Sequence, residues 1–307
     1  MTKFSTPRRR ALLGGGLVAL AAGLHDLLRF SHAASAPEAP DGRPRLQGTA
    51  PALFIGHGSP MNALQDNDFT RHLRRWGRDL GLPKAVLMVS AHWLTEGQTA
   101  VMVDAQPGTL HDFGGFPPEL FAQRYPAPGA PAWAARTAGR LAPRAIGRHQ
   151  GRGLDHGAWT VLKHLYPAAD VPVFQLSIDI TRPAADHLAV GRAIAALRAE
   201  GVLVIGSGNI VHNLGDTVRG AAPSARGLRD WADDFDQRAK AALDAGDTAA
   251  LLAYERLGPH GLRAVPFPDH YYPLLYALGT AQAGERAQQV FEGFQSGTLS
   301  MRCVQWG

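Results

Sequence analysis

The sequence has a single cysteine and lacks the common local signatures of catalysis. Cys303 is the only cysteine among 307 residues, so no intrachain disulfide can form, even in an oxidising compartment. It lies in the apolar run TLSMRCVQW and is expected to pack in the core or in an edge strand. No HExxH, CxxC, P-loop or GxSxG pattern occurs. No basic stripe alternates with aromatic residues either, so nucleic acid is not expected as a partner.

The N-terminal 36 residues have the order of regions that is typical of a signal peptide. Arg8, Arg9 and Arg10 precede an apolar run over 11–24, and the small residues of 34–36 follow. The paired arginines and the glycine-containing, weakly apolar run favour export by the twin-arginine machinery to the periplasm. A membrane span needs about 20 apolar residues, so no stable span is expected in the mature form. An uncleaved membrane anchor or a basic tail is the alternative interpretation.

This segment also carries most of the charge of the chain. Its five basic residues and one acidic residue account for four of the five net positive charges. The remaining chain is therefore close to neutral, and a basic binding surface is not expected from its composition.

Beyond a linker predicted over 37–50, apolar runs alternate with helical patterns. This alternation predicts an α/β fold in which a mostly parallel central sheet is flanked by helices. Residues 51–307 contain no strong internal repeat or flexible linker, so we expect one domain. Helical patterns cover 158–166, 183–199 and 226–244, and strands are expected at 52–55, 85–90, 99–103, 171–178, 202–206 and 298–305.

Four histidines follow apolar runs or stand in a tight turn. His57 follows ALFIG, His92 follows AVLMVSA, His212 follows VLVIGSGNIV, and His270 stands in PFPDHYYP. In open α/β sheets, ligands bind beyond the carboxyl ends of the strands. Several imidazoles at one such edge predict a site for zinc, iron or copper. The small residues of 206–209 are expected to let the backbone approach a ligand closely.

Two His–Asp pairs offer further candidates. His111 and Asp112 begin the loop sequence HDFGGFP, while Asp155 and His156 precede the helical pattern at 158–166. In each pair the carboxylate is a candidate to orient an imidazole. The alternative for the second pair is that Asp155 caps the helix and His156 lies on the surface.

Taken together, these segments resemble the 4,5-DOPA extradiol dioxygenases, which belong to the class III, LigB-type, ring-opening dioxygenases. The resemblance rests on PALFIGHGSPMNAL, VSAHW, HDFGGFP, GLDHGAWTVL, GSGNIVHNL and PDHYYPLLYALG, and it covers roughly 51–307. It implies a LigB-like single domain and an enzyme that inserts O2 into a small aromatic diol. The export signal is a departure, since familiar members of the family are cytoplasmic.

The resemblance implies one divalent metal ion, Fe(II) or Zn(II), held by His57, His92, His212 and His270. In the wider class, two histidines and a glutamate hold the iron. His57 and His92 match the two histidines, while His270 stands where that class has its carboxylate. His212 matches the histidine regarded as catalytic, although in zinc-bound members it lies close enough to count as a ligand. An all-histidine set departs from the usual iron site and leaves zinc open.

The resemblance also implies residues on the substrate side of the metal. His212 would take a proton from a hydroxyl of the catechol, and His156 would bind the substrate or help to transfer the proton. His111, Phe113 and Phe116 would line the pocket, where the aromatic rings stack on the substrate.

Two other functions fit the same histidines. A zinc-dependent hydrolase would use a metal-bound water of lowered pKa as its nucleophile. A non-catalytic, exported zinc-binding protein would hold zinc with all four imidazoles.

Overall fold

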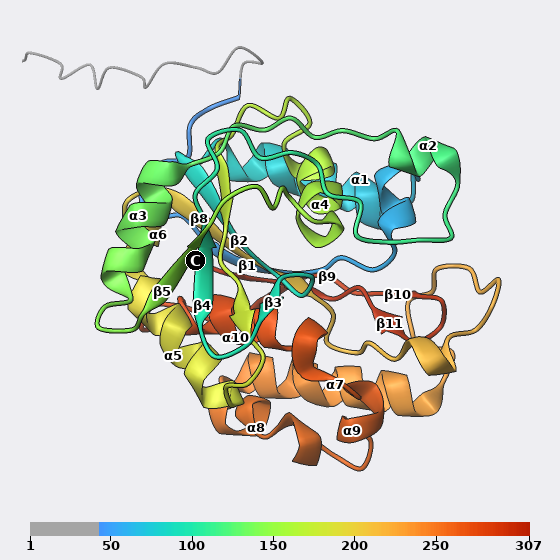
Figure 1. Ribbon diagram of the computed structural model, residues 1–307. Helices are drawn as coiled ribbons and strands as arrows, with labels where there is room; N and C mark the ends of the chain where they lie inside the picture. Colours follow the sequence, from blue (N-terminus) through green and yellow to red (C-terminus); the bar gives the residue numbers. More distant parts are fainter. Residues whose placement is uncertain (1–42) are drawn as a thin grey trace, which may run out of the picture. The chain divides into compact units, whose positions relative to one another are not determined.

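The computed structural model describes residues 43–307, so the predicted signal peptide lies outside the described residues. Within 43–307, no helix combines the length and the apolar character that crossing a membrane requires. The described chain forms an α/β domain around a central sheet with the strand order β6-β2-β8-β1-β12-β9 (Figure 1). The bounds of these strands, in chain order, are β1 Ala52–Gly56, β2 Ala85–Ser90, β6 Val173–Gln175, β8 Val202–Gly208, β9 Gln288–Phe291 and β12 Cys303–Trp306.

The sheet is parallel over four neighbouring strands and antiparallel at one side. β2 pairs in parallel with both β6 and β8, and β8 pairs in parallel with β1. β12 then pairs antiparallel with β1, and β9 pairs antiparallel with β12. Every residue of β1, β2 and β8 is buried, which is the pattern of parallel strands covered on both faces. The expected mostly parallel sheet is confirmed.

Helices cover both faces of this sheet (Figure 1). Alternate residues of a strand face opposite sides, and β8 shows which helix lies on which side. Ser207 faces α4, where its hydroxyl donates to the carbonyl of Gly157, while Gly206 and Gly208 face the start of α10. The helices are α1 Asp68–Leu80, α2 Pro118–Phe121, α3 Pro131–Arg140, α4 His156–Leu165, α5 Ala184–Ile194, α6 Ala196–Ala199, α7 Asp230–Ala245, α8 Thr248–Leu252, α9 Gly261–Ala264 and α10 Tyr272–Gly279.

Short strand pairs extend the domain beyond the central sheet. The run expected over 99–103 forms a strand, but it pairs with another short strand outside the central sheet. The run at 171–178 breaks after Gln175, and the run at 298–305 is divided by two residues between β11 and β12. The additional strands are β3 Leu94–Thr95, β4 Thr99–Met102, β5 Ile146–His149, β7 Ile178–Asp179, β10 Phe294–Gln295 and β11 Leu299–Ser300.

The three predicted helices are present, with shifted ends. The segment expected over 183–199 is divided into α5 and α6 near Ala195. α4 begins at His156, two residues before the apolar pattern, because Asp155 accepts a hydrogen bond from the backbone N–H of Ala158 at 3.2 Å. The alternative interpretation is thus confirmed for Asp155, which caps the helix, but it is wrong for His156, which is buried. Cys303 is fully buried in β12, as its apolar neighbours indicated.

Candidate metal centre

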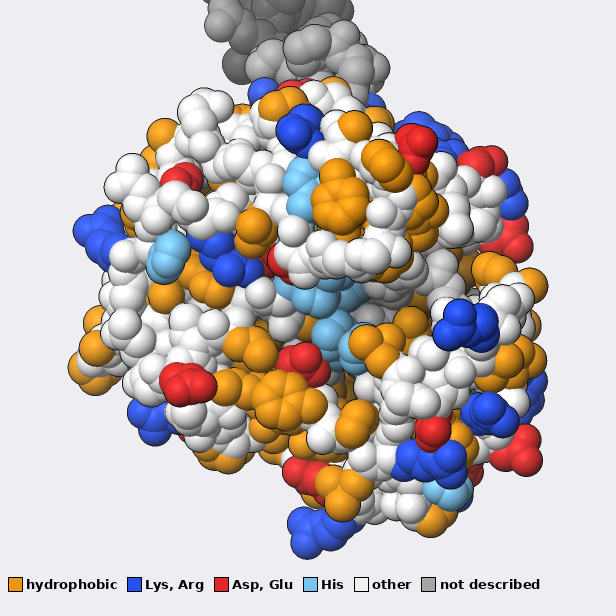
Figure 2. Space-filling view, turned by 45° about the vertical axis from the view of Figure 1, so that its right-hand side comes forward, with side chains coloured by type: hydrophobic (Ala, Val, Ile, Leu, Met, Phe, Trp, Pro, Cys, Tyr) orange, Lys and Arg blue, Asp and Glu red, His pale blue; other side chains and the backbone are white. Residues whose placement is uncertain are grey.

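Three of the singled-out histidines lie beyond the carboxyl ends of adjacent parallel strands. His57 directly follows β1, His92 follows β2, and His212 follows β8. Because β8 lies between β1 and β2, these strand ends meet at the same edge of the sheet. Figure 2 shows histidine side chains in a hollow of the molecular surface, with hydrophobic side chains beside it.

His270 reaches this edge from a distant part of the chain. It ends a short 3-10 helix, Pro268–His270, that leads into α10. Its carbonyl accepts the backbone N–H of Asn209 at 2.9 Å, and a Cβ on Gly208 would lie 2.1 Å from the same oxygen. The glycines of 206–209 therefore admit the His270 segment, a packing role that the sequence did not indicate.

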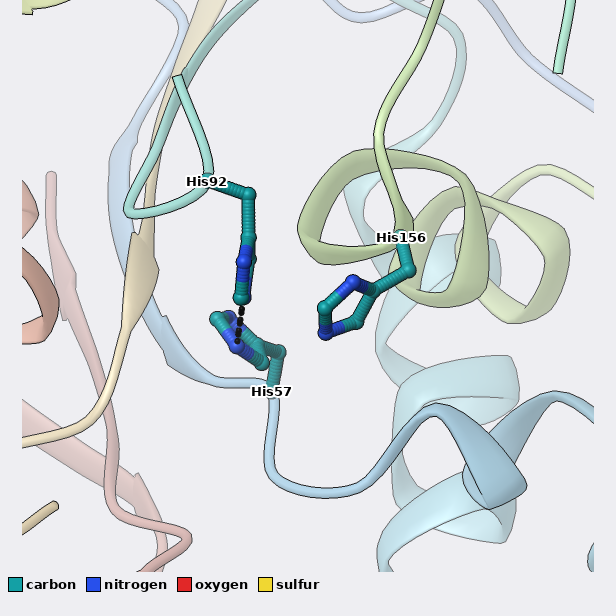
Figure 3. Close-up of side chains that lie close together, drawn as sticks. All are labelled: His57, His92 and His156. Atoms are coloured by element: carbon teal, nitrogen blue, oxygen red, sulfur yellow. Dashed lines mark hydrogen bonds between the residues drawn. The ribbon is translucent and has the colours of Figure 1, made fainter. Parts of the chain in front are cut away.

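The structure brings the four predicted ligands together and adds His156 to them. The ring centroids of His57, His92 and His270 are 5.0–5.3 Å apart, and His212 stacks on His270 at 3.5 Å with an interplanar angle of 4°. His156, on the first turn of α4, points its ring toward the pair formed by His57 and His92 (Figure 3). Its ring centroid is 3.8 Å from that of His92.

The possible metal-ligand atoms at the carboxyl edge of the sheet form two groups. Within each group, one atom of every side chain lies within 4.8 Å of the others. The first group is His57, His92 and His156, and the second is His212, Asp269 and His270. The predicted ligands are thus divided between the two groups, and Asp269 brings a carboxylate that the sequence analysis did not assign to the site.

Hydrogen bonds determine which nitrogen of His57 faces the centre. The hydroxyl of Ser207 donates its only proton to the carbonyl of Gly157 at 2.6 Å. The hydroxyl oxygen must therefore accept a hydrogen bond from Nδ1 of His57, which lies 2.9 Å away. His57 consequently carries its proton on Nδ1 and presents the lone pair of Nε2 to the site.

The contact between His57 and His92 fits a shared metal ion. Their Nε2 atoms are 3.1 Å apart, as drawn in Figure 3. Two nitrogens bound to one zinc ion at about 2.0–2.1 Å are roughly 2.9–3.4 Å apart at octahedral to tetrahedral angles. Nδ1 of His92 lies 3.5 Å from a carboxylate oxygen of Asp112, which favours a proton on that nitrogen too. Two lone pairs then face each other, and a cation between them would relieve their repulsion.

Burial keeps these imidazoles uncharged. Desolvation and the neighbouring histidines hold the pKa values of His57 and His270 well below 6.5. Desolvation, followed by the charge of His156, lowers the pKa of His92 to about 4. Desolvation also lowers the pKa of His212, although the carboxylate of Asp269 opposes it. Since a metal binds neutral imidazole, few protons compete for these nitrogens at neutral pH.

The predicted pocket residues lie at increasing distance from the histidines. The ring of Phe113 is 5.6 Å from that of His156. Phe116 and His111 contact the ring of Phe113 at 5.4 and 5.7 Å, so both lie one ring further away. Nε2 of His111 is 3.1 Å from the carbonyl oxygen of Gln123.

Three polar groups lie beside the imidazoles, and only Asp112 among them was recognised from the sequence, as a candidate to orient an imidazole. These are the Ser207 hydroxyl beside His57, the Asp112 carboxylate beside His92 and His156, and the Asp269 carboxylate, which lies 3.0 Å from Nδ1 of His270. Burial disfavours ionisation of Asp112, but its interactions with His156 and His92 outweigh burial and lower its pKa to about 2. The available sequence signal was the adjacency of Asp112 to His111 and of Asp269 to His270.

Comparison with known proteins identifies the family. The family model of the catalytic LigB subunit of aromatic ring-opening dioxygenase matches residues 51–301. The chain belongs to the LigB family. It is 45% identical to the 4,5-DOPA dioxygenase extradiol of Escherichia coli K12 over 260 residues, which cover 84% of this chain and 94% of that protein. The Beta vulgaris protein of the same name is 38% identical over 254 residues, covering 81% and 93%.

The fold agrees with this family. The crystal structure of an uncharacterized Escherichia coli K12 protein matches with a TM-score of 0.73 and 41% sequence identity, covering 84% of this chain and all of that one. The expected enzyme class, an extradiol ring-opening dioxygenase of the LigB family, is thus confirmed. LigB dioxygenases depend on a metal, and the histidine cluster provides suitable ligands.

Close packing at the start of α4 generates a test of the ligand geometry. A Cβ on Gly157 would lie 2.5 Å from Oγ of Ser90 and 3.0 Å from Cδ2 of His92. Gly157→Ala should therefore displace the His92 ring and weaken Zn(II) binding by about tenfold, the lower end of the range for groups that support metal ligands. Competition with a chromophoric chelator measures this affinity.

Gly139→Ala is the matched control, because no atom lies within 4 Å of a Cβ at that exposed helical position. It should leave zinc affinity unchanged and stabilise the protein by about 0.5–1 kcal/mol. Equal zinc affinities for Gly157→Ala and the wild type would show that this packing does not position His92.

Proposed function

We propose that this LigB-family enzyme opens the ring of a DOPA-like catechol with one Fe(II) ion held by His57, His92 and His270. The observation that carries the proposal is the convergence of neutral imidazoles at the carboxyl edge of a parallel sheet. The substrate class follows the printed names of the Escherichia coli and Beta vulgaris relatives. Zn(II) is the alternative metal, and zinc-dependent hydrolysis or non-catalytic zinc binding is the alternative function.

The stacking of His212 on His270 supports separate roles for these two residues. The two rings are almost parallel, with centroids 3.5 Å apart. Rings stacked in this way are poorly arranged to hold one ion together, so only one of the two histidines would hold the metal. We assign His270 as the ligand because Asp269 lies beside its Nδ1 and leaves Nε2 for the metal.

When bound, Fe(II) would supply coordination positions for both catechol oxygens and for O2. The protein supplies the proton transfers. His212 is neutral at neutral pH because burial lowers its pKa, so it can accept a proton from a catechol hydroxyl. Asp269 would then stabilise the imidazolium by its negative charge, since it is the carboxylate that favours protonation of His212.

His156 and the loop that carries Phe113 and Phe116 would form the side of the metal site that faces the substrate. Nδ1 of His156 lies 3.0 Å from a carboxylate oxygen of Asp112, which favours a proton on Nδ1 and leaves the lone pair of Nε2 to accept a hydrogen bond or a proton from a substrate hydroxyl. Phe113 lies beside His156 and can stack on an aromatic ring. Phe116 and His111 both contact the ring of Phe113, so we expect their influence on the substrate to pass through that ring.

Export is a further part of the proposal. The paired arginines, the short apolar run and the small residues of 1–36 support twin-arginine transport to the periplasm. That route carries folded proteins, which suits a metal loaded before export. The catechol substrate would then be met outside the cytoplasm.

Reconstitution decides between the iron and zinc functions. The metal-free protein is loaded with Fe(II) under anaerobic conditions, mixed with L-DOPA and then exposed to air. We expect oxygen uptake together with a yellow ring-opened product, whereas the Zn(II)-loaded protein should consume no oxygen. If the Fe(II) protein consumes no oxygen with any of a panel of catechols, the dioxygenase proposal is wrong and the zinc functions gain support.

Two substitutions separate metal binding from proton transfer. His57→Ala should abolish stoichiometric metal binding along with turnover. His212→Phe should retain the metal but lower kcat by about 10²–10⁴-fold, the usual contribution of general acid–base catalysis, with a smaller effect on KM. Metal analysis and oxygen-uptake kinetics measure both properties.

His149→Ala is the control, since His149 is exposed in β5 and outside the histidine cluster. Loss of the metal in His212→Phe would place His212 among the ligands. Turnover like that of the wild type would remove it from the mechanism.

A further inference from the structure

One carboxylate, that of Asp112, lies beside two imidazoles of the site. Its Oδ1 accepts the backbone N–H of His156 at 2.9 Å and lies 3.0 Å from Nδ1 of the same residue. Its Oδ2 lies 3.5 Å from Nδ1 of His92. We propose that Asp112 is a positioning residue that sets the tautomer and the orientation of His92 and His156 together. The proposal rests on the functions assigned above to these two histidines.

The chemistry of the carboxylate makes this control directional. An ionised carboxylate only accepts hydrogen bonds, so it favours imidazoles that carry their proton on the nearby Nδ1. The Nε2 lone pairs of both rings are then available to the site. For His92 this is the nitrogen that lies 3.1 Å from Nε2 of His57. A neutral amide at position 112 would present a donor to one of the rings and favour the opposite tautomer there.

Hydrogen bonds attach the loop that carries Asp112 to α4 and to the chain that precedes it. The backbone N–H of Leu110 donates to the carbonyl of Leu154 at 2.7 Å, and that of Leu154 donates to Gly108 at 2.7 Å. The indole of Trp159, on α4, donates to the carbonyl of Leu110 at 3.0 Å. These bonds attach the loop to the chain that leads into α4, so Asp112 approaches the first backbone N–H of this helix.

Asp155, which is adjacent to His156 in the sequence, has other functions. Its carboxylate accepts hydrogen bonds from Ser90 at 2.6 Å and from Gln175 at 2.8 Å, and it caps α4. Its hydrogen bonds therefore connect α4 to β2 and β6, and it supports His92 through the backbone, since its partner Ser90 also accepts the backbone N–H of His92 at 3.2 Å. Asp155 thus fixes the backbone at the start of α4, whereas Asp112 orients the rings of His92 and His156.

Asp112→Asn tests the proposal with almost no change in shape. The metal-free full chain is titrated with Zn(II) against a chromophoric chelator, and Fe(II)-loaded protein is assayed with L-DOPA. We expect zinc affinity and kcat each to fall about 10- to 100-fold, the usual cost of losing a group that supports a metal ligand. Nitrogen-15 NMR of the metal-free protein should show the His92 proton moving from Nδ1 toward Nε2.

A His156→Gln background separates the effect of Asp112→Asn on zinc affinity from its effect on kcat. In this background, Asp112→Asn should still weaken zinc binding, because that effect passes through His92. With the metal site saturated, it should cause little further loss of kcat, because the part of the effect on turnover that does not come from metal affinity passes through His156.

Asp104→Asn is the matched control. Asp104 is a buried acid preceding the same loop, and its Oδ1 accepts the backbone N–H of Gly151 at 2.8 Å. The control should keep the zinc affinity and the imidazole spectra of the wild type. Affinity and spectra like those of the wild type in folded Asp112→Asn would overturn the proposal. If the enzyme opened no catechol ring but Asp112→Asn still weakened zinc binding, the proposed function would fail and the role of Asp112 would stand.

Discussion

The site depends on burying several imidazoles together without charging them. Burial disfavours the protonated form, so His57, His92, His212 and His270 have lowered pKa values and are neutral at neutral pH. Nδ1 of His57 donates a hydrogen bond to the Ser207 hydroxyl, and the negative charge of Asp269 lies 3.0 Å from Nδ1 of His270. The opposite nitrogens are left for a metal. Burial and these partners thus prepare the donor set before any ion binds.

The parallel sheet explains how such a cluster can be built from distant parts of the chain. β1, β2 and β8 are neighbours, and a histidine follows the carboxyl end of each of them at the same edge of the sheet. The glycines of β8 let the segment before α10 pack against the sheet closely enough to bring His270 to the same place. A side chain at Gly208 would therefore move a proposed ligand, because its Cβ would collide with the backbone carbonyl of His270.

The sequence predicted the elements better than the contacts between them. Fully apolar runs identified β1, β2 and β8, and histidines at their ends identified the site. The antiparallel position of β12 and the exclusion of β4 from the central sheet depend on long-range pairing, which periodicity does not encode. Asp112 was noticed beside His111, yet it contacts His92 and His156, because adjacent side chains diverge while a folded loop brings distant ones together. Ser207 was missed because its role depends on the accepting carbonyl of Gly157.

The most direct test of this account is the position of the metal. A crystal of the Fe(II)-loaded protein, measured on both sides of the iron absorption edge, locates iron independently of the refined coordinates. We expect one iron per chain within bonding distance of His57, His92 and His270, with His212 outside the ligand set. Iron bound away from these three histidines, or bound by His212 in place of His270, would contradict the account.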